Sequence, residues 1–539
     1  MRAVPSPGSL VRSPGRRRAA AALVHLVIAI AATAPLAWRT GLPLGREPTP
    51  TVPRFNLWTL RWTADRLPHG LAGWWDAPIF APNHGTFAWS EPQPLTGVAF
   101  AAARAVVGDE RGYAVVLIVT LALNGIAGAA LARRLGASRR AALLAGILVQ
   151  TVPFTWDQLG VVQLLALWPI LAGMAATVAW AETGRARHAV AIGAAAAAGI
   201  ATCGTLSFLG LLATAPATLV LVRRRWWRDP ARWLGVGLAV ATPMLLVGPV
   251  LVAQQQARLD GFRWRSETIL AGSARPGDWI GGRTGPGLVL LALGLAGLWC
   301  WRRQRAAWFV AAAALIATVA ALGLRLRVGS AEPWAFAVDH LDAFARLRSP
   351  YRATAIAQVA LAVLSAGVLD RLLRRPPGPR RAPTGTVAAV ALVAVGVLAA
   401  RPGPGPIERA AREPGAWRPA LTAAHDGEDG AVAFLPFAPD TSTAAFAPTT
   451  ERMLQAEGTG VAMVNGYSGF FPPDHARLRA DLRGFPDERS LATLRAHGAR
   501  WVVVDAPGWD RIDRRIAAEL GIETLTEDLD GVLLELPRA

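Results

Sequence analysis

The sequence predicts a mainly α-helical protein, in which a polytopic helical membrane domain is followed by a smaller soluble α/β domain at the C-terminus. Its 539 residues are 53% hydrophobic and 17% charged, with a mean hydropathy of +0.33, whereas soluble domains carry about 25% charged residues. Apolar stretches of roughly 20 residues, long enough to cross the hydrocarbon core of a bilayer, recur up to residue 400 and stop there.

The basic surplus of the chain belongs to its hydrophobic part. All 56 basic residues are Arg; residues 1–400 hold 41 of them against 16 acids, and residues 401–539 hold 15 against 21 acids. A net charge of +19 would suggest nucleic-acid binding in a soluble protein. Here the Arg residues lie between apolar spans, where they determine topology, so we expect membrane lipids and no nucleic acid as partners.

We expect about eleven transmembrane helices. Their approximate ranges are 19–38, 113–132, 139–155, 160–180, 187–203, 206–222, 233–253, 286–301, 306–324, 353–373 and 384–400. The apolar stretch 95–107 is too short to span, so it predicts an interfacial or re-entrant helix. The first span follows a basic run without a convincing cleavage site, which predicts an uncleaved anchor.

The placement of Arg predicts the orientation in the membrane. With the N-terminus in the cytoplasm, every cytoplasmic connection is rich in Arg, and the short outward connections near 156–159 and 204–205 contain none. The cytoplasmic connections are 133–140, 185–187, 223–232, 302–305 and 371–381. We therefore expect a multi-pass protein of the cytoplasmic (inner) membrane. The last outward loop, which contains Arg325 and Arg327, fits this rule less well.

Residues 401–539 read as a separate extracytoplasmic α/β domain that follows the transmembrane domain 1–400. A Pro/Gly-rich linker begins at Arg401. Short apolar runs alternate with amphipathic stretches, a pattern typical of strands that alternate with helices. The expected strands are 431–437, 501–505 and 531–536, and the expected helices are 474–483, 487–497 and 510–519. The two cysteines, Cys203 and Cys300, are expected to be unpaired thiols near opposite membrane faces.

The first outer loop, residues 39–111, is the main candidate for function because it is far longer than a helix connection requires. Its many Trp and Phe residues suit helices that lie in the membrane interface. On this topology thirteen of the sixteen acids of residues 1–400 face outward. Six of them lie in this loop: Glu47, Asp65, Asp76, Glu91, Asp109 and Glu110.

The irregular segment 75–91 displays Asp76, Asn83, His84 and Glu91. A carboxylate here could act as a general base on a hydroxyl, or hold a divalent metal that neutralises a phosphate. The alternative is that these residues cap helices and solvate the loop. A single His without a partner is no metal site, so we expect no obligate cofactor and leave a divalent metal open.

Two further outward segments could join this loop. Asp157 and Gln158 lie between two spans, where Asp157 suits a helix cap better than a catalyst. Arg346, Arg348 and Arg352 are concentrated at the outer end of another span, and guanidinium groups bind phosphate bidentately. Contact with lipid headgroups is an equal alternative for these Arg residues. No Walker A motif, dinucleotide fingerprint or Gly-x-Ser-x-Gly elbow is present, which disfavours an ATP-driven pump or a serine hydrolase.

The arrangement of a first helix, a long acidic outer loop, many helices and a C-terminal outer domain resembles the GT-C glycosyltransferase superfamily. Three sets of segments are similar to a group of bacterial GT-C-like membrane proteins. The first set is 55–58 (Phe-Asn-Leu-Trp), 79–82 (Ile-Phe-Ala-Pro) and 86–91 (Thr-Phe-Ala-Trp-Ser-Glu). The second is 344–352. The third is 435–437, 464–473 (Val-Asn-Gly-Tyr-Ser-Gly-Phe-Phe-Pro-Pro) and 498–504.

The resemblance implies transfer of a sugar from a polyprenyl-phosphate donor on the outer membrane face. The group usually has an Asp about four residues before the Asn-Leu-Trp motif, where this chain has Val52. The chemistry would then fall to Asp65, Asp76 or Glu91, with the donor phosphate on Arg346, Arg348 and Arg352. Expected substrate contacts are Asn56, Trp58, Asn83, His84 and Gln158.

Two alternatives stay open. Without the early Asp, the protein could be a non-catalytic one that binds or translocates a lipid-linked glycan. The aromatic residues Tyr467, Phe470 and Phe471 are expected to pack the C-terminal domain onto the membrane part in preference to holding a sugar ring.

Overall fold

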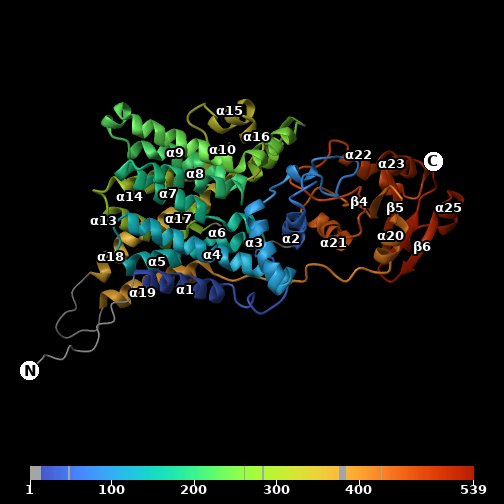
Figure 1. The fold of residues 1–539 in the computed structure, drawn as a ribbon, viewed down its shortest axis with the longest axis horizontal. Helices are drawn as coiled ribbons and strands as arrows, with labels where there is room; N and C mark the ends of the chain where they lie inside the picture. The colour runs from blue at the N-terminus through green and yellow to red at the C-terminus, as the bar shows by residue number, and fades with distance from the viewer. Residues whose placement is uncertain are drawn as a thin grey trace, which may run out of the picture.

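The computed structural model describes residues 14–45, 49–259, 261–281, 285–374, 384–426 and 428–538. Glu47 and part of the expected connection 371–381 lie outside these residues. The helices up to α19 pack side by side, and the strands gather with the C-terminus at the opposite end from the N-terminus (Figure 1). The outer-loop helices α2 (Thr51–Arg66) and α3 (Pro94–Val107) lie between the two parts (Figure 1).

A helix lies at each expected span. These helices are α1 (Pro14–Ala32), α4 (Asp109–Arg134), α5 (Arg139–Gln150), α7 (Trp168–Thr183), α8 (Ala186–Ile200), α9 (Gly204–Ala217), α10 (Pro230–Leu259), α13 (Gly287–Cys300), α14 (Arg305–Ala321), the pair α17 (Thr354–Leu364) and α18 (Ala366–Leu373), and α19 (Thr384–Ala400). Among the described residues, four stretches are long and apolar enough to cross a membrane: Asp109–Arg134, Val162–Thr183, Pro230–Gln256 and Pro350–Leu373. The crossing of the shorter apolar helices remains a prediction.

Proline divides two of the expected spans. The span 139–155 ends early, because Val152 takes the extended conformation that precedes Pro153, and α6 (Pro153–Asp157) then starts as a separate turn. Likewise Pro169 lies at the start of α7, after a short 3-10 turn over Val162–Leu165. Both breaks place irregular backbone at the ends of helices, where it helps to form the site described below.

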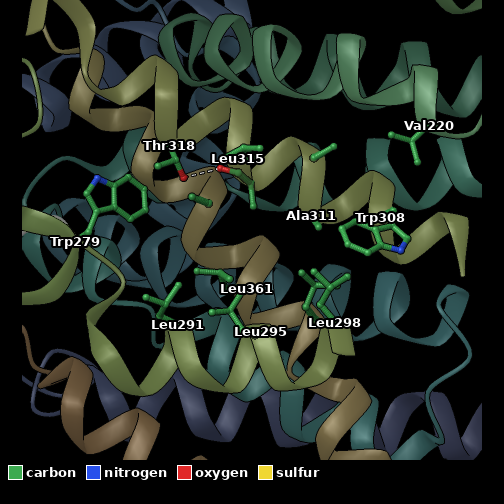
Figure 2. A pocket seen from close by; sticks show the side chains of 15 residues that line it. Val220, Trp279, Leu291, Leu295, Leu298, Trp308, Ala311, Leu315, Thr318 and Leu361 are labelled. Carbon is green, nitrogen blue, oxygen red and sulfur yellow. Dashed lines mark hydrogen bonds between the residues drawn. The ribbon is translucent and has the colours of Figure 1, made fainter. Parts of the chain in front are cut away.

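Glycines let several helices approach at backbone distance. A Cβ atom on Gly297 of α13 would lie 1.9 Å from the carbonyl oxygen of Leu364 on α17. Small residues are typical of membrane helix interfaces for this reason. Farther along the same helices, α13, α14 and α17 line an open apolar pocket of about 640 Å³, with Trp279 and Trp308 at its two ends (Figure 2). Its lining suits a hydrocarbon chain.

The outer loop buries its aromatic residues instead of presenting them to the membrane interface. Trp58, Trp62, Trp74 and Trp89 are each at most 7% exposed. They belong to one core with residues of the C-terminal region, such as Phe434. The expectation of interfacial aromatic helices is therefore wrong for these residues, because the C-terminal region covers the loop and removes them from lipid and water.

The C-terminal region contains a five-stranded sheet in the order β4-β3-β5-β7-β6. Its strands are β3 (Ala431–Leu435), β4 (Ala462–Met463), β5 (Ala499–Asp505), β6 (Glu523–Asp528) and β7 (Gly531–Glu535), and its helices include α20 (Trp417–His425), α21 (Ala447–Ala456), α22 (His475–Asp481), α23 (Glu488–Ala496) and α25 (Arg514–Glu519). β4, β3 and β5 run parallel to one another. β7 runs antiparallel to both of its neighbours, β5 and β6. The predicted strands and helices are confirmed.

The apolar strand β3 is buried on both faces, as in sheets covered on two sides. Val432 and Phe434 face the core shared with the outer loop, and Ala433 and Leu435 face the core beneath α22 and α23. One face of the sheet is therefore packed against the outer loop.

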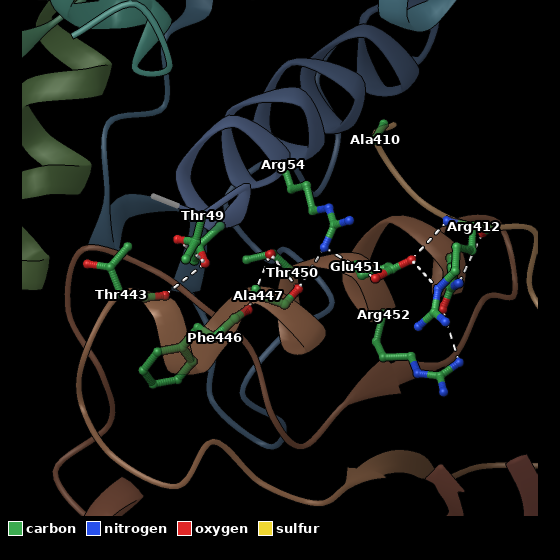
Figure 3. A network of polar contacts seen from close by, with 12 residues as sticks. Thr49, Arg54, Ala410, Arg412, Thr443, Phe446, Ala447, Thr450, Glu451 and Arg452 are labelled. Atoms are coloured by element: carbon green, nitrogen blue, oxygen red, sulfur yellow. Dashed lines mark hydrogen bonds and ion pairs between the residues drawn. The ribbon is translucent and has the colours of Figure 1, made fainter. Parts of the chain in front are cut away.

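Two sets of contacts join the C-terminal region to the outer loop. The short strand β1 (Leu42–Pro43), which follows the first helix, pairs antiparallel with β2 (Ile407–Glu408), which follows the last one. Arg54 of α2 also reaches Glu451 of α21 at 3.2 Å, and Arg412 lies on the other side of that carboxylate (Figure 3). The region after the Pro/Gly-rich linker is thus held directly on the loop.

Candidate functional site

A cavity of about 470 Å³ lies where the outer loop, the ends of several helices and the C-terminal region meet. Its walls come from residues 88–91 of the outer loop, the turns around α6, the first residues of α9, and the segment 343–352 that leads into α17. Residues 467–470, which follow β4, complete it. Residues far apart in the sequence therefore build one site.

Among the described residues that line this cavity, Glu91 is the one acid. Its carboxylate contacts the first residues of α9, and its Oε2 accepts a hydrogen bond from the Gly204 amide at 2.7 Å. Its Oε1 accepts from the amide and the hydroxyl of Thr205 at 2.9 and 2.7 Å. A carboxylate at a helix N-terminus is stabilised by the free amides and the helix dipole, so Glu91 is held rigidly in the cavity wall.

Three predicted phosphate ligands, Arg346, Arg348 and Arg352, line the same cavity. The backbone of their segment rests on Gly272, whose Cβ would lie 2.2 Å from the Arg348 carbonyl oxygen and whose own carbonyl accepts from the Tyr351 amide. The Arg348 guanidinium lies over the Trp264 ring, 5.1 Å from its centre. The Nε of Arg352 is buried and has no hydrogen-bond partner in the described part of the chain.

The charges of the cavity suit a phosphate better than a divalent cation. The described lining residues include three guanidinium groups and one carboxylate, and anions such as phosphate pair bidentately with Arg. Divalent cations prefer several oxygen ligands with carboxylates among them. Within the described residues there is no group of three His, Cys, Asp or Glu that could hold a metal.

Gln158 also lines the cavity and is supported from behind by Asp157. Its Nε2 donates to Asp157 Oδ2 at 2.7 Å, and both residues are buried. This contact orients the Gln158 carbonyl oxygen and amide. Asp157 itself is not a lining residue.

Four of the other predicted residues lie in the outer loop but away from the cavity. Asp65 pairs with Arg104 at 2.5 Å in a cluster between α2, α3 and α4. Asp76 is half exposed, where it accepts from the Gly85 amide at 2.9 Å and lies 3.4 Å from the exposed ring of His84. Asn83 donates to the Phe80 carbonyl. All four stabilise the loop.

Two predicted substrate contacts are core residues. Trp58 stacks on Phe55 and meets the edge of Phe87. Asn56 is fully buried, and its Oδ1 accepts from Gln93 Nε2 at 3.1 Å. The Asn-Leu-Trp motif therefore stabilises α2, and of its neighbours only Phe55 and Val52 line the cavity. Val52, which stands where the resemblance placed an Asp, is thus a wall residue of the site.

Several lining residues could not be singled out from the sequence: Thr205, Gln254, Trp264 and Thr443. None belongs to a motif that carries chemistry by itself. Tyr467 and Phe470 do pack the C-terminal region onto the rest, since Tyr467 meets Phe55 edge-on and Phe470 stacks on Phe262 at 5.1 Å. Both also line the cavity.

The overall fold is similar to solved membrane glycosyltransferases. The Archaeoglobus fulgidus oligosaccharyltransferase tethered to an acceptor peptide is 12% identical, with a TM-score of 0.54 over 91% of this chain and 69% of that one. The same organism's oligosaccharyltransferase AglB, in complex with an inhibitory peptide and a dolichol-phosphate, is 11% identical, with a TM-score of 0.50 and coverage of 91% and 69%. The mycobacterial arabinofuranosyltransferase AftD is 16% identical, with a TM-score of 0.52 over 98% of this chain and 42% of that one.

The chain therefore shares its overall fold with these solved proteins. It belongs to the family described as a domain of unknown function, DUF6311, whose model matches residues 74–400. No curated protein matches the sequence.

Proposed function

We propose that the protein is a membrane glycosyltransferase that transfers a sugar from a polyprenyl-phosphate donor to an acceptor on the outer face of the cytoplasmic membrane. The observation that carries this proposal is the cavity in which Glu91 lies with Arg346, Arg348 and Arg352. A carboxylate and a phosphate-binding group in one cavity are what such a transfer requires, and the GT-C type of fold supports the same class.

In this proposal the donor phosphate binds to Arg348 and Arg352. When the bond between the sugar C1 and the phosphate oxygen breaks, negative charge develops on the leaving lipid phosphate, and the fixed guanidinium groups stabilise it. The acceptor hydroxyl forms the new bond to C1 and gives its proton to Glu91. Among the described residues, Glu91 Oε2 accepts one hydrogen bond, from the Gly204 amide, so it retains a lone pair for this proton.

The second candidate is a protein that binds or moves a lipid-linked glycan without chemistry. Val52 in the cavity wall favours it, because the acid implied there by the resemblance is missing. The hydrogen bonds that Glu91 accepts from Gly204 and Thr205 favour it as well, since they suit a structural cap. Both candidates bind the same class of lipid.

The test is sugar transfer from a radiolabelled polyprenyl-phosphate hexose by the purified protein. We expect Glu91→Gln to lower the transfer rate by about 100-fold or more while the donor still binds, as for the loss of a general base. Asp76→Asn is the matched control, because this carboxylate lies in the same loop outside the cavity. Full activity of Glu91→Gln would exclude Glu91 as the base, and donor binding without any transfer by the wild type would support the second candidate.

A further inference from the structure

We propose that residues 443 and 467–470 of the C-terminal region form the carbohydrate subsite of the cavity, and that this subsite accepts an uncharged sugar ring. The inference rests on the proposed function, which places a lipid-linked sugar in this cavity. It adds which part of the protein contacts the sugar and which class of sugar fits.

The charged and the uncharged lining residues come from different parts of the sequence. In the described part of the chain, the charged lining residues are Glu91 and the three Arg residues, and all of them precede residue 353. The lining residues from the C-terminal region are uncharged: Thr443, Tyr467, Ser468, Gly469 and Phe470. Hydroxyl and aromatic groups suit a neutral sugar, and none of these five residues carries a charge that could compensate one on the ring.

The sheet positions these uncharged residues. Segment 467–470 follows β4 and Thr443 follows β3, so both come from the carboxyl ends of neighbouring parallel strands, where α/β sheets commonly bind ligands. The Asn465 side chain donates to the Phe434 carbonyl and accepts from its amide, at 2.8 and 3.1 Å. These two hydrogen bonds to β3 fix the start of the segment, and a prepared surface loses less entropy on binding.

Two glycines bring the segment close to the outer loop. A Cβ on Gly466 would lie 2.9 Å from the Ile79 Cβ, and one on Gly469 would lie 2.8 Å from the Trp89 carbonyl oxygen. Both distances are shorter than those that a real Cβ atom keeps from a neighbouring atom, so only glycine lets the segment reach the cavity. Ser468 lies between these glycines, is buried, and lines the cavity.

Aromatic residues are concentrated around the cavity. Of the 29 described residues that line it, seven are aromatic, although aromatic residues make up only 7% of the whole chain. They include two of the three tyrosines. Phe470 already stacks on Phe262 and Trp264, so it holds the wall together. Tyr467 also packs against Phe55, but unlike Phe470 it carries a hydroxyl, which can donate a hydrogen bond to a sugar. We therefore assign Tyr467 and Ser468 to the sugar.

The experiment compares the binding of two lipids of equal charge to the purified full-length protein: polyprenyl-phosphate glucose, and polyprenyl methyl phosphate, which lacks the sugar. We expect the wild type to bind the glucose lipid more tightly. Ser468→Ala and Tyr467→Leu should each weaken binding of the glucose lipid about five- to tenfold, as for a lost hydrogen bond or ring contact. Their affinity for the methyl phosphate should stay within about twofold.

Two controls make the result specific. Phe437→Leu removes an aromatic ring of the C-terminal region that contacts His475 and does not line the cavity, so it should not change either affinity. Polyprenyl-phosphate glucuronic acid should bind no more tightly than the methyl phosphate. Melting temperatures of the variants identify any loss of folding, and Tyr467→Phe, which keeps the ring, should retain more glucose affinity than Tyr467→Leu.

The outcomes separate this inference from the proposed function. If the wild type does not bind polyprenyl methyl phosphate, the proposed function is wrong. If it binds this lipid but the glucose adds no affinity, or if Ser468→Ala and Tyr467→Leu leave the glucose affinity unchanged, the carbohydrate subsite is wrong and the phosphate site stands. Tight binding of the glucuronic acid lipid would overturn the assignment to a neutral sugar.

Discussion

Glu457 is a buried acid at the contact between the outer loop and the C-terminal region. It follows α21, and its Oε2 lies 2.5 Å from Arg61 Nε of α2. Asp65, Arg104 and Asp109 surround the same pair. Burial raises the pKa of Glu457 from 4.5 to about 8, and the two nearby acids add to this effect while Arg61 and Arg104 oppose it.

This residue predicts a pH dependence of stability. Between pH 4.5 and about 8 the unfolded chain has released this proton and the folded protein has kept it, so the free energy of unfolding falls as pH rises through this window and is then constant for this group. Glu457→Gln removes this titration, so its free energy of unfolding should fall less as the pH rises. Near pH 8 its melting temperature should exceed that of the wild type by about 2–4 °C for each kcal/mol gained.

Thermal unfolding in detergent across this pH range measures the effect. Glu527→Gln is the control, since Glu527 forms an exposed pair with Arg514 at 2.7 Å and such pairs contribute little. A Glu457→Gln curve parallel to that of the wild type would contradict the prediction.

Single residues also mark what the sequence can predict about the site. The segment 344–352 is predicted to bind phosphate from its Arg residues alone, and Arg346, Arg348 and Arg352 do line one cavity. Asp76 and Glu91 are equal candidates in the sequence, because both are acids of one irregular loop. Their environments differ only through partners distant in sequence, such as Thr205, which lies 114 positions from Glu91.

At the scale of elements, apolar length and periodicity predict the helices and strands well. The errors have local causes, as at Pro153, which divides an expected span. The aromatic helix α2 is expected in the membrane interface because Trp is common there. A Trp-rich helix buried under a sheet has the same composition, and the strand and helices that cover α2 come from residues more than 300 positions later.

The contact between α13 and α17 predicts a strong effect of one methyl group. In Gly297→Ala the new Cβ would meet the Leu364 backbone at 1.9 Å, and backbone cannot move aside as a flexible side chain does. We expect a loss of about 1–3 kcal/mol, as for overpacked cores, and a lower melting temperature in detergent.

Gly237→Ala is the matched control for this substitution. Gly237 lies within α10 and has nothing within 4 Å of a built Cβ. Alanine is the better helix former, so this variant should be neutral or slightly stabilised. Equal melting temperatures of the two variants would show that the helices can separate at no cost.

For the whole molecule, we predict that the C-terminal region lies outside the cytoplasm. Ser442 is exposed near the cavity, and Gln304 is exposed in the Arg-rich connection between α13 and α14. In a Cys300→Ser background, where the remaining Cys203 is buried, Ser442→Cys should react with a membrane-impermeant maleimide in spheroplasts. Gln304→Cys should react only after permeabilisation, and the opposite pattern would invert the topology.

Sequence patterns do not reveal how the C-terminal region packs against the rest of the molecule. Residues 401–539 are expected as a domain joined through a linker, and nothing in their composition reveals that they complete a site begun by residues 88–91. Packing between distant segments depends on shape, as at Gly466 and Gly469, whose close contacts with the outer loop emerge only in three dimensions.

The pairing of β1 with β2 also bears on how the protein is made. Leu42 leaves the ribosome early, but its partner Glu408 is synthesised only after every helix of the bundle. Since domains form in the order of synthesis, the outer loop must wait, with its edge strand and Arg54 unpartnered, throughout insertion of the helices. The cavity is therefore the last part of the molecule to assemble, and a nascent chain that stalls before the sheet carries a complete bundle without a binding site.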